Sequence, residues 1–391
     1  MRIATFCLTA ALAAAASADW TVFRGAAPYD GPQPAADVSA EDAVKWSAEL
    51  DGRGLSAPVV VGDKVFVTTS GGLSGERLGL IAFDKATGDR LWTRQLWATG
   101  RTVCHEKTCN AAPSPASDGE RVFTFYSSGD AAAYDLDGNL LWYRGLGRDF
   151  PNASNSLGMS SSLVVADGVV VCMLECDADS RTFGLDATNG ETVWNIARPR
   201  LANWTSPVVA EYAGRPTVLL QSGEGLTAVD PQTGETAWQW DNGASTVSSP
   251  TVAGDVIVAP ADGLTAIRPG EDAESVWSNE KMSPATVSPV VVGNAVLSIN
   301  RAGVLGAADL ETGERVWQQR LKGPFSATPV VAGDLVFAVS EAGLLQVVRV
   351  SGDGAEPVSE RELGETVLGT PALDGGALYV RSDGTLWRIG G

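Results

Sequence analysis

The sequence predicts an all-β fold, an eight-bladed β-propeller of four-stranded antiparallel blades. Two signatures recur along the chain: Ser/Thr/Ala-Pro before a valine-rich run with a Gly-Asp or Asp-Gly turn, and A-x-D-x-x-T-G-E-x-x-W. Recurrence of such signatures along a chain is typical of structural repeats, each of which buries its apolar faces only against neighbouring repeats. The chain also ends on a third-strand segment, Asp383–Gly391, while a fourth-strand segment, VKWSAEL, stands at Val44–Leu50. We therefore expect the N-terminal strand to complete the C-terminal blade and close the ring.

The first signature predicts the two inner strands of each blade, joined by a tight turn in which glycine supplies the backbone angles. The copy from Ser160 keeps the pattern without its proline. Eight blades are expected to begin near Ser56, Pro113, Ser160, Thr205, Ser248, Val287, Ala327 and Gly369.

The second signature predicts the hairpin of the two outer strands. Its aspartate can bond the turn backbone, its glycine takes the left-handed conformation, and its tryptophan fills the gap between neighbouring blades. Burying such a side chain is worth about 2–3 kcal/mol. Blades five and seven carry degraded copies. We expect a structural tryptophan girdle formed by Trp46, Trp92, Trp142, Trp194, Trp238, Trp277 and Trp317.

Three segments are expected: a signal peptide at 1–18, an N-terminal arm at 19–42 and the propeller at 43–391. Arg2, an apolar run from Ile3 to Ala16 and the small residues up to Ala18 are typical of an exported protein. Cys7 is not expected to carry a lipid, because Phe6 precedes it where a small residue is needed. No other stretch is long and apolar enough to span a bilayer. The sequence predicts a periplasmic or extracellular protein.

The charge balance restricts the partners. The formal net charge is −19 and the pI is about 4.4, so the surface repels nucleic acid and anionic lipid. Neither is expected as a partner.

These repeats resemble the PQQ-like β-propeller repeat of quinoprotein dehydrogenases and of BamB-type outer-membrane assembly proteins. The chain is also similar to secreted members that begin W-x-x-F-R-G, here Trp20–Gly25, and carry His-Glu-Lys-Thr before blade two, here His105–Thr108. The resemblance covers residues 44–391 and implies the propeller fold. It also implies an exported, non-enzymatic scaffold, monomeric by default, that presents the loops of one face to another envelope or extracellular protein.

Two alternatives remain open. The first is a PQQ-dependent oxidoreductase. Resemblance to the quinoprotein dehydrogenases would imply an adjacent Cys-Cys pair, a calcium held by carboxylate and amide ligands, and an aspartate base. The sequence has no adjacent cysteines. We expect no cofactor, no metal and no catalytic residue. The second alternative is a carbohydrate-binding propeller that uses aromatic side chains on one face.

The cysteines of the exported chain are candidates for disulfides, since their number is even and the compartment is oxidising. Their pairing stays open among Cys104, Cys109, Cys172 and Cys176. A less favoured hypothesis is a zinc site from Cys104, His105, Cys109 and Cys176. His105 is the only histidine, and we expect it to make a hydrogen bond within its own loop.

Several residues outside the repeat are candidates for binding a partner. Trp97 and Trp204 lie outside the tryptophan girdle, where they either anchor a ligand or pack under the Pro-rich arm at 26–34. Arg24, His105 and Lys107 belong to the two segments that carry the resemblance.

Overall fold

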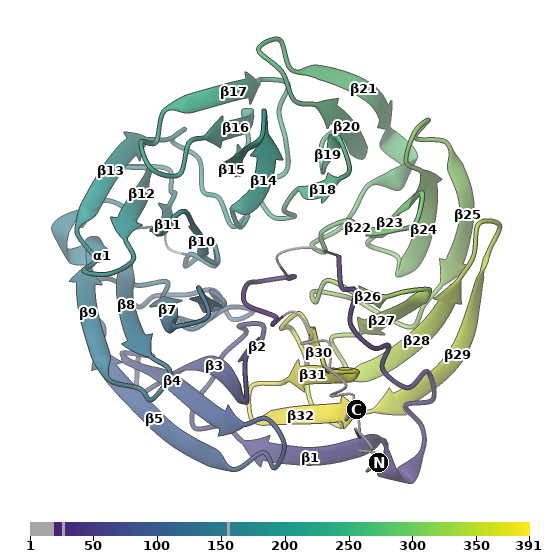
Figure 1. Ribbon diagram of the computed structural model, residues 1–391, viewed down its shortest axis with the longest axis horizontal. Helices are drawn as coiled ribbons and strands as arrows, with labels where there is room; N and C mark the ends of the chain where they lie inside the picture. The colour runs from purple at the N-terminus through teal and green to yellow at the C-terminus, as the bar shows by residue number, and fades with distance from the viewer. Residues whose placement is uncertain (1–18, 26–27, 155–156) are drawn as a thin grey trace, which may run out of the picture.

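A computed structural model shows the protein as an eight-bladed β-propeller (Figure 1). The structure describes residues 19–25, 28–154 and 157–391, so the expected signal peptide and Cys7 lie outside the described residues. Each of the eight sheets has four antiparallel strands. The predicted fold class and the predicted number of blades are confirmed.

The first four blades follow the chain from the inner to the outer strand. Blade 1 consists of β2 (Val59–Val61), β3 (Lys64–Gly71), β4 (Arg77–Asp84) and β5 (Arg90–Trp97). Blade 2 consists of β6 (Ala116–Ser117), β7 (Arg121–Phe125), β8 (Asp130–Asp135) and β9 (Leu140–Gly145), and α1 (Leu146–Asp149) follows it. Blade 3 consists of β10 (Val164–Ala166), β11 (Val169–Leu174), β12 (Arg181–Asp186) and β13 (Thr192–Ala197). Blade 4 consists of β14 (Val208–Tyr212), β15 (Arg215–Ser222), β16 (Gly225–Val229) and β17 (Thr236–Trp240).

The last four blades repeat this order until the ring closes. Blade 5 consists of β18 (Thr251–Ala253), β19 (Val256–Ala259), β20 (Leu264–Arg268) and β21 (Glu274–Asn279), followed by the 3₁₀ turn η2 (Glu280–Met282). Blade 6 consists of β22 (Val290–Val292), β23 (Ala295–Ile299), β24 (Val304–Asp309) and β25 (Arg315–Arg320). Blade 7 consists of β26 (Val330–Ala332), β27 (Leu335–Val339), β28 (Leu344–Val350) and β29 (Ala355–Glu362). Blade 8 consists of β30 (Ala372–Asp374), β31 (Ala377–Arg381), β32 (Thr385–Gly390) and β1 (Val44–Glu49), which the 3₁₀ turn η1 (Glu41–Ala43) precedes.

Blade 8 joins the two ends of the chain. Strand β1 pairs antiparallel with β32, with Trp46 opposite Arg388 and Ser47 opposite Trp387. The predicted closure by the N-terminal strand is therefore confirmed.

A chain of hydroxyl groups explains the Ser/Thr of the first signature. At seven of the eight junctions between blades, a buried backbone N–H at the start of one blade donates to the hydroxyl at the same position of the next. These bonds run from Ala57 to Ser114, Ser114 to Ser162, Ser162 to Ser206, Ser206 to Ser249, Ser249 to Ser288, Ser288 to Thr328 and Thr328 to Thr370. Each bond satisfies a buried donor and fixes one blade against the next.

The junction from blade 8 to blade 1 is different, because Ala57 has no hydroxyl. Here the buried Arg381 of β31 donates to the Ser56 hydroxyl at 3.1 Å and to the Thr68 carbonyl at 2.8 Å. Burial lowers the pKa of Arg381 to about 10, so the guanidinium remains charged at neutral pH. A cationic side chain thus joins the seam between the first and last blades.

The tryptophan girdle is bonded as well as packed. In six of its seven members the indole N–H donates to a carbonyl in the outer turn of the next blade, which is Lys85, Leu136, Ala187, Pro231, Leu310 or Ser351. Within the described residues, the indole nitrogen of Trp238 has no partner. The corresponding turn of blade 5, between β20 and β21, is the degraded copy, which lacks the Thr-Gly-Glu sequence.

Blade 7 has no girdle tryptophan, and the N-terminal arm occupies the gap. Ser359 of β29 stands opposite Val347, the position that tryptophan takes in the other blades. Its hydroxyl donates to the Ala36 carbonyl and accepts from the Val38 backbone N–H. Arg361 donates to the carbonyl of Val38 at 2.8 Å. The arm therefore packs against the outer strand of blade 7 just before it becomes β1.

Candidate functional site

The blade topology gives the molecule two different faces. The turns between the first and second strands, and between the third and fourth, lie on one side, which we call the turn face. The loops between the second and third strands, and those entering the next blade, lie on the other side, which we call the loop face. The longest connections, at 98–115 and 146–163, belong to the loop face, where variable segments commonly carry function.

The N-terminal arm crosses the central channel at the turn face (Figure 1). The Trp20 carbonyl accepts from Val60 of blade 1, and the Thr21 carbonyl accepts from Ser117 of blade 2. Arg24 then donates at 2.9 Å to the carbonyls of Pro250 in blade 5 and Pro289 in blade 6. The W-x-x-F-R-G segment thus connects opposite sides of the ring.

Arg24 is therefore placed inside the channel, and not on the outer surface where a protein partner would dock. Burial lowers the pKa of Arg24 to about 10, so it stays protonated at neutral pH. A cavity of about 660 Å³ lies beside it, between the arm and the inner strands of blades 4 to 7.

This axial cavity does not fit a calcium-bound quinone. A calcium ion takes six to eight oxygen ligands, with carboxylates prominent among them. Glu211 is the only carboxylate residue among the described residues that line the cavity. Nowhere in the described part of the chain do three or more His, Cys, Asp or Glu side chains gather as a metal site would require.

The His-Glu-Lys-Thr segment lies on the loop face. Arg53, at the entry to blade 1, donates to the carbonyls of Glu106 at 2.6 Å and Thr108 at 2.9 Å. Lys107 forms an ion pair of 3.0 Å with Glu341 of blade 7. The segment thus spans from blade 1 to blade 7 past the loop end of blade 8, and its backbone is fixed there.

Two titratable groups, His105 of this segment and Glu341 of blade 7, have local roles. The Nδ1 atom of His105 accepts from the Lys107 backbone N–H at 3.1 Å, which is the expected hydrogen bond within the loop. Burial alone would raise the pKa of Glu341, but hydrogen bonds from Ser326 and Lys107 lower it below its ordinary value. Glu341 is therefore ionised at neutral pH and can hold Lys107.

All four described cysteines are free thiols, so the expected disulfides are not formed in the structure. Cys172 is buried within β11, opposite Phe183, and burial raises its thiol pKa to about 12. Burial likewise raises the pKa of Cys109 to about 11. The alternative zinc cluster is not assembled either, since the described residues include no such group of ligands.

The two tryptophans outside the girdle differ. Trp97 ends β5 on the loop face, and its side chain is 67% exposed. Trp204 is half-buried, and its indole N–H donates to the Gly158 carbonyl at 2.7 Å. Trp97 is thus available to a partner, whereas Trp204 holds a neighbouring loop. Neither packs under the arm, which lies at the turn face.

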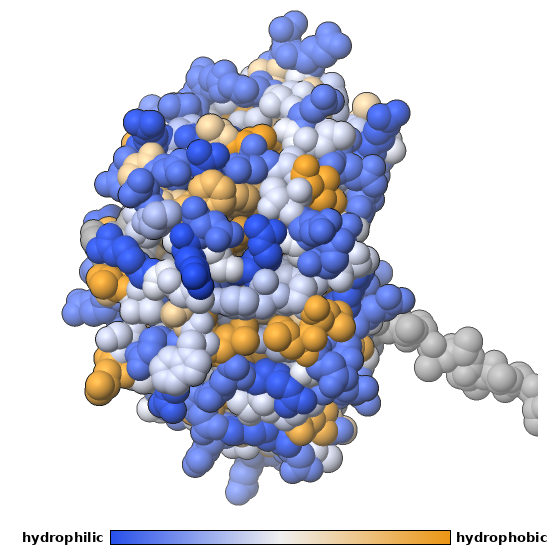
Figure 2. Space-filling model, turned by 90° about the vertical axis from the view of Figure 1, so that its left-hand side faces the viewer, coloured by the Kyte–Doolittle hydropathy of each residue, from blue (hydrophilic) through white to orange (hydrophobic). Residues whose placement is uncertain are grey.

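The exposed large apolar side chains have a clear distribution. Of twelve in the described residues, six lie along the outer strands away from the loop face, and the other six lie on the loop face, where Trp97 is the last residue of the outer strand β5. Those of the outer strands are Leu91, Leu140, Leu141, Val193, Val316 and Val358. Those of the loop face are Leu73, Trp97, Val103, Leu157, Leu201 and Val247. Figure 2, a view of the edge of the ring, shows apolar side chains as separate patches on a largely hydrophilic surface.

Sequence reasoning found only Trp97 of the loop-face group. The available signal was an apolar residue within a polar loop between blades, as at Val103, Leu201 and Val247. Blades 1 to 4 contribute all six side chains. This half of the loop face is the candidate docking surface.

A buried ion pair beneath this surface was also missed. Glu175 accepts from Arg198 at 2.7 Å and from Asn203 at 2.7 Å, and all three side chains are almost fully buried. Thr182 adds a further bond to the carboxylate. Because the network is well satisfied, it fixes the loop that carries Leu201. A glutamate directly after the apolar strand β11 was the signal for it.

Comparison with known proteins gives a consistent relationship. The family model described as outer membrane protein assembly factor BamB matches residues 30–175, 152–245 and 178–390. A curated protein of that name from Moranella endobia (strain PCIT) is 24% identical over 229 residues, which cover 57% of this chain and 53% of that protein. Its counterpart from Alkalilimnicola ehrlichii is 28% identical over 224 residues, covering 56% and 52%. The matched region thus spans about half the length of these curated relatives.

Solved structures share the fold. BamB from Moraxella catarrhalis has a TM-score of 0.63 at 18% identity, covering 88% of this chain and 96% of that one. The quinohemoprotein alcohol dehydrogenase from Comamonas testosteroni has a TM-score of 0.69 at 15% identity, covering 95% and 80%. At such identities the likeness concerns the fold alone. None of the helices in the described residues has the length and apolar character needed to cross a membrane.

Proposed function

The chain belongs to the family described as outer membrane protein assembly factor BamB, and on that premise we propose that it is an exported, non-enzymatic scaffold that binds another protein of the cell envelope. Its docking surface is the loop face of blades 1 to 4. In this proposal the signal peptide delivers the chain to the periplasm or the cell exterior, where it supports the assembly of outer-membrane proteins as the names of its relatives describe.

The observation that carries the proposal is that all six exposed large apolar side chains of the loop face come from blades 1 to 4. Exposed aromatic and aliphatic side chains commonly anchor protein interfaces, and tryptophan is enriched among the residues that contribute most to binding. Trp97 is the largest of them. The bonds from Arg53 to the carbonyls of 106 and 108, and the ion pair of Lys107, hold the adjacent loop in place, which lowers the conformational cost of binding.

The alternatives have less support. The likeness to a dehydrogenase is one of fold, and the axial cavity lacks the carboxylates that a calcium-bound quinone would need. For the carbohydrate hypothesis, Trp97 is an exposed aromatic, but Trp204 is engaged with Gly158. We therefore favour a protein partner.

Site-specific photo-crosslinking in the native envelope tests the proposal. The photoreactive residue replaces Trp97, Val103 or Leu201 on the loop face, or Val193 or Val316 on the outer strands. Val193 and Val316 are the controls. Each is 48% exposed, which is close to the exposed fractions of Val103, 54%, and Leu201, 45%.

We expect one discrete protein to be captured from the loop-face positions and not from the two controls. Thermal melts of each purified variant establish that the fold is intact. Capture of nothing from any loop-face position, or equal capture from the outer strands, would refute the proposal.

A further inference from the structure

The cavity at the turn face has the properties of a small-molecule site. Its volume of about 660 Å³ falls in the range of ligand pockets, which are mostly apolar with a few polar groups. The inner strands supply an apolar wall, and the arm supplies a second one. Representative lining residues are Val208, Val252, Val291 and Val331 from the blades and Trp20 and Phe23 from the arm.

Arg24 is the cation of this cavity. Its Nη1 atom donates to Pro250 and its Nη2 atom donates to Pro289 and to the Thr251 hydroxyl, while its buried Nε atom has no partner in the described residues. Carbonyl and hydroxyl oxygens satisfy hydrogen bonds but carry no full negative charge. No carboxylate in the described part of the chain forms an ion pair with Arg24.

The backbone conformation also indicates that the surrounding structure holds Arg24 in its position. Arg24 has φ of 70°, a left-handed conformation that a non-glycine residue rarely adopts. Such strain persists only where the surroundings enforce it, and it is common at ligand sites. The arm thus holds an uncompensated cation against apolar walls, where an opposite charge gains most from the low dielectric.

We propose that the axial cavity binds a small monocarboxylate with an apolar body. The carboxylate faces the Arg24 guanidinium, which has five N–H donors and uses only part of them for the carbonyls. The apolar body lies against the valines of blades 4 to 7. A single negative charge fits because one guanidinium is present, Glu211 also lines the cavity, and the whole chain carries −19.

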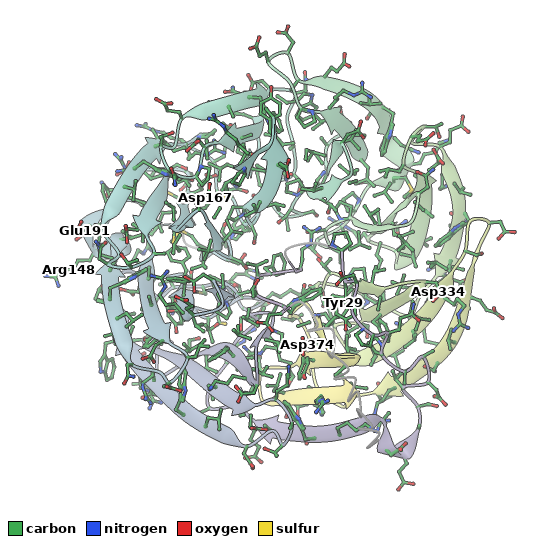
Figure 3. All side chains as sticks on the ribbon, viewed as in Figure 1. Tyr29, Arg148, Asp167, Glu191, Asp334 and Asp374 are labelled. Carbon is green, nitrogen blue, oxygen red and sulfur yellow. The ribbon has the colours of Figure 1, made fainter. Side chains whose placement is uncertain are left out.

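This site is independent of the proposed protein-binding function, since it lies at the turn face and the docking surface lies at the loop face. Figure 3 labels Tyr29, another residue of the cavity lining, near the middle of the ring. Its hydroxyl accepts from the Gly376 backbone N–H at 3.1 Å and anchors the arm to blade 8. The lining therefore consists of elements that are already bonded to the ring.

Calorimetric titration of the mature chain with decanoate tests the proposal, together with quenching of tryptophan fluorescence by a brominated decanoate. Trp20 lines the cavity, so a ligand bound there lies within reach of its indole. We expect saturable binding of one decanoate per chain. Decanol, which has the same body without the charge, is expected to bind at least about tenfold more weakly, a factor worth about 1.4 kcal/mol.

Three variants separate the contributions. Arg24→Gln removes the charge and is expected to weaken decanoate binding at least about tenfold. Val291→Trp fills the cavity and keeps Arg24, so it is expected to abolish binding even if the first variant loosens the arm. Arg268→Gln is the matched control, because Arg268 is half-exposed, pairs with Glu274 and does not line the cavity.

The proposal is overturned by any of three results: no decanoate binding to the intact protein, equal binding of decanol and decanoate, or unchanged binding by both Arg24→Gln and Val291→Trp. Each of these would leave the loop-face crosslinks unaffected. Failure of the two proposals can therefore be distinguished.

Discussion

The girdle contact between Trp142 and Gly190 gives a prediction whose size follows from the structure. Gly190 lies in the outer turn of blade 3 with φ of 73°, directly under the indole of blade 2. A β-carbon added there would stand 2.7 Å from two indole carbons. Gly168, in the inner turn of the same blade, has φ of 76° and no atom within 4 Å of such a carbon. Figure 3 labels their neighbours Glu191 and Asp167.

The two Gly→Ala variants share every cost except the contact with tryptophan. Each places alanine in the left-handed region, at about 1–2 kcal/mol, and each reduces the freedom of the unfolded chain by a similar amount. Only Gly190→Ala must displace the indole by about 1 Å to restore a normal carbon contact. Overpacking of this kind costs about 1–3 kcal/mol. We expect Gly190→Ala to lose that much more stability than Gly168→Ala.

Urea unfolding followed by tryptophan fluorescence and near-UV circular dichroism measures the difference. The midpoints of the two variants are compared at a common slope. Equal midpoints would refute the interpretation that the glycine of the second signature is required by the tryptophan of the preceding blade, and would leave turn geometry as its only role.

Two further predictions concern the thiols and the low-pH stability. Cys104 is the only described cysteine that is partly exposed, so in a native chain that starts at Asp19 a thiol reagent at pH 8 should label that position alone. Labelling should be slow because burial raises the pKa of Cys104. Cys172 should react only after denaturation, and rapid labelling of Cys172 would contradict its burial. Hydrogen bonds from the Thr188 side chain and backbone lower the pKa of Asp186 below its ordinary 3.8. The ionised carboxylate therefore stabilises the fold fully at pH values above 3.8, and this stabilisation is lost as the pH falls through the folded-state pKa of Asp186. The stability difference between wild type and Asp186→Ala should accordingly shrink as the pH of urea titrations is lowered toward 2, and a constant difference would exclude this role of the carboxylate.

The sequence was sufficient to predict the architecture because the signals for it are local. Each blade carries its own turn and tryptophan, and the VKWSAEL segment matches the other outer strands by direct comparison. Even the exception in blade 7 is visible as a missing tryptophan, although only the structure shows that the bonds of Ser359 to the arm replace it.

The features of the site depend on contacts that the sequence does not contain. Arg24 bonds to residues more than 220 positions away, and Lys107 bonds to Glu341 at a similar separation. The disulfide prediction failed because cysteine number says nothing of side-chain direction: Cys172 points into the core, while Cys104 lies near Ser127 in a loop region. The seam was missed because the repeat pattern does not show that Arg381 bonds to Ser56 and Thr68, which lie more than 310 positions away in the sequence.

The central claim is that the loop face of blades 1 to 4 is the docking surface. Hydrogen–deuterium exchange tests it when the propeller is measured alone and in complex with the partner that the crosslinks identify. We predict slower exchange on binding at 98–112 and 198–205, with no change at the inner turns around Gly254, Gly293 and Gly333. Protection confined to those turns or to the outer strands, with the loops unchanged, would contradict the claim.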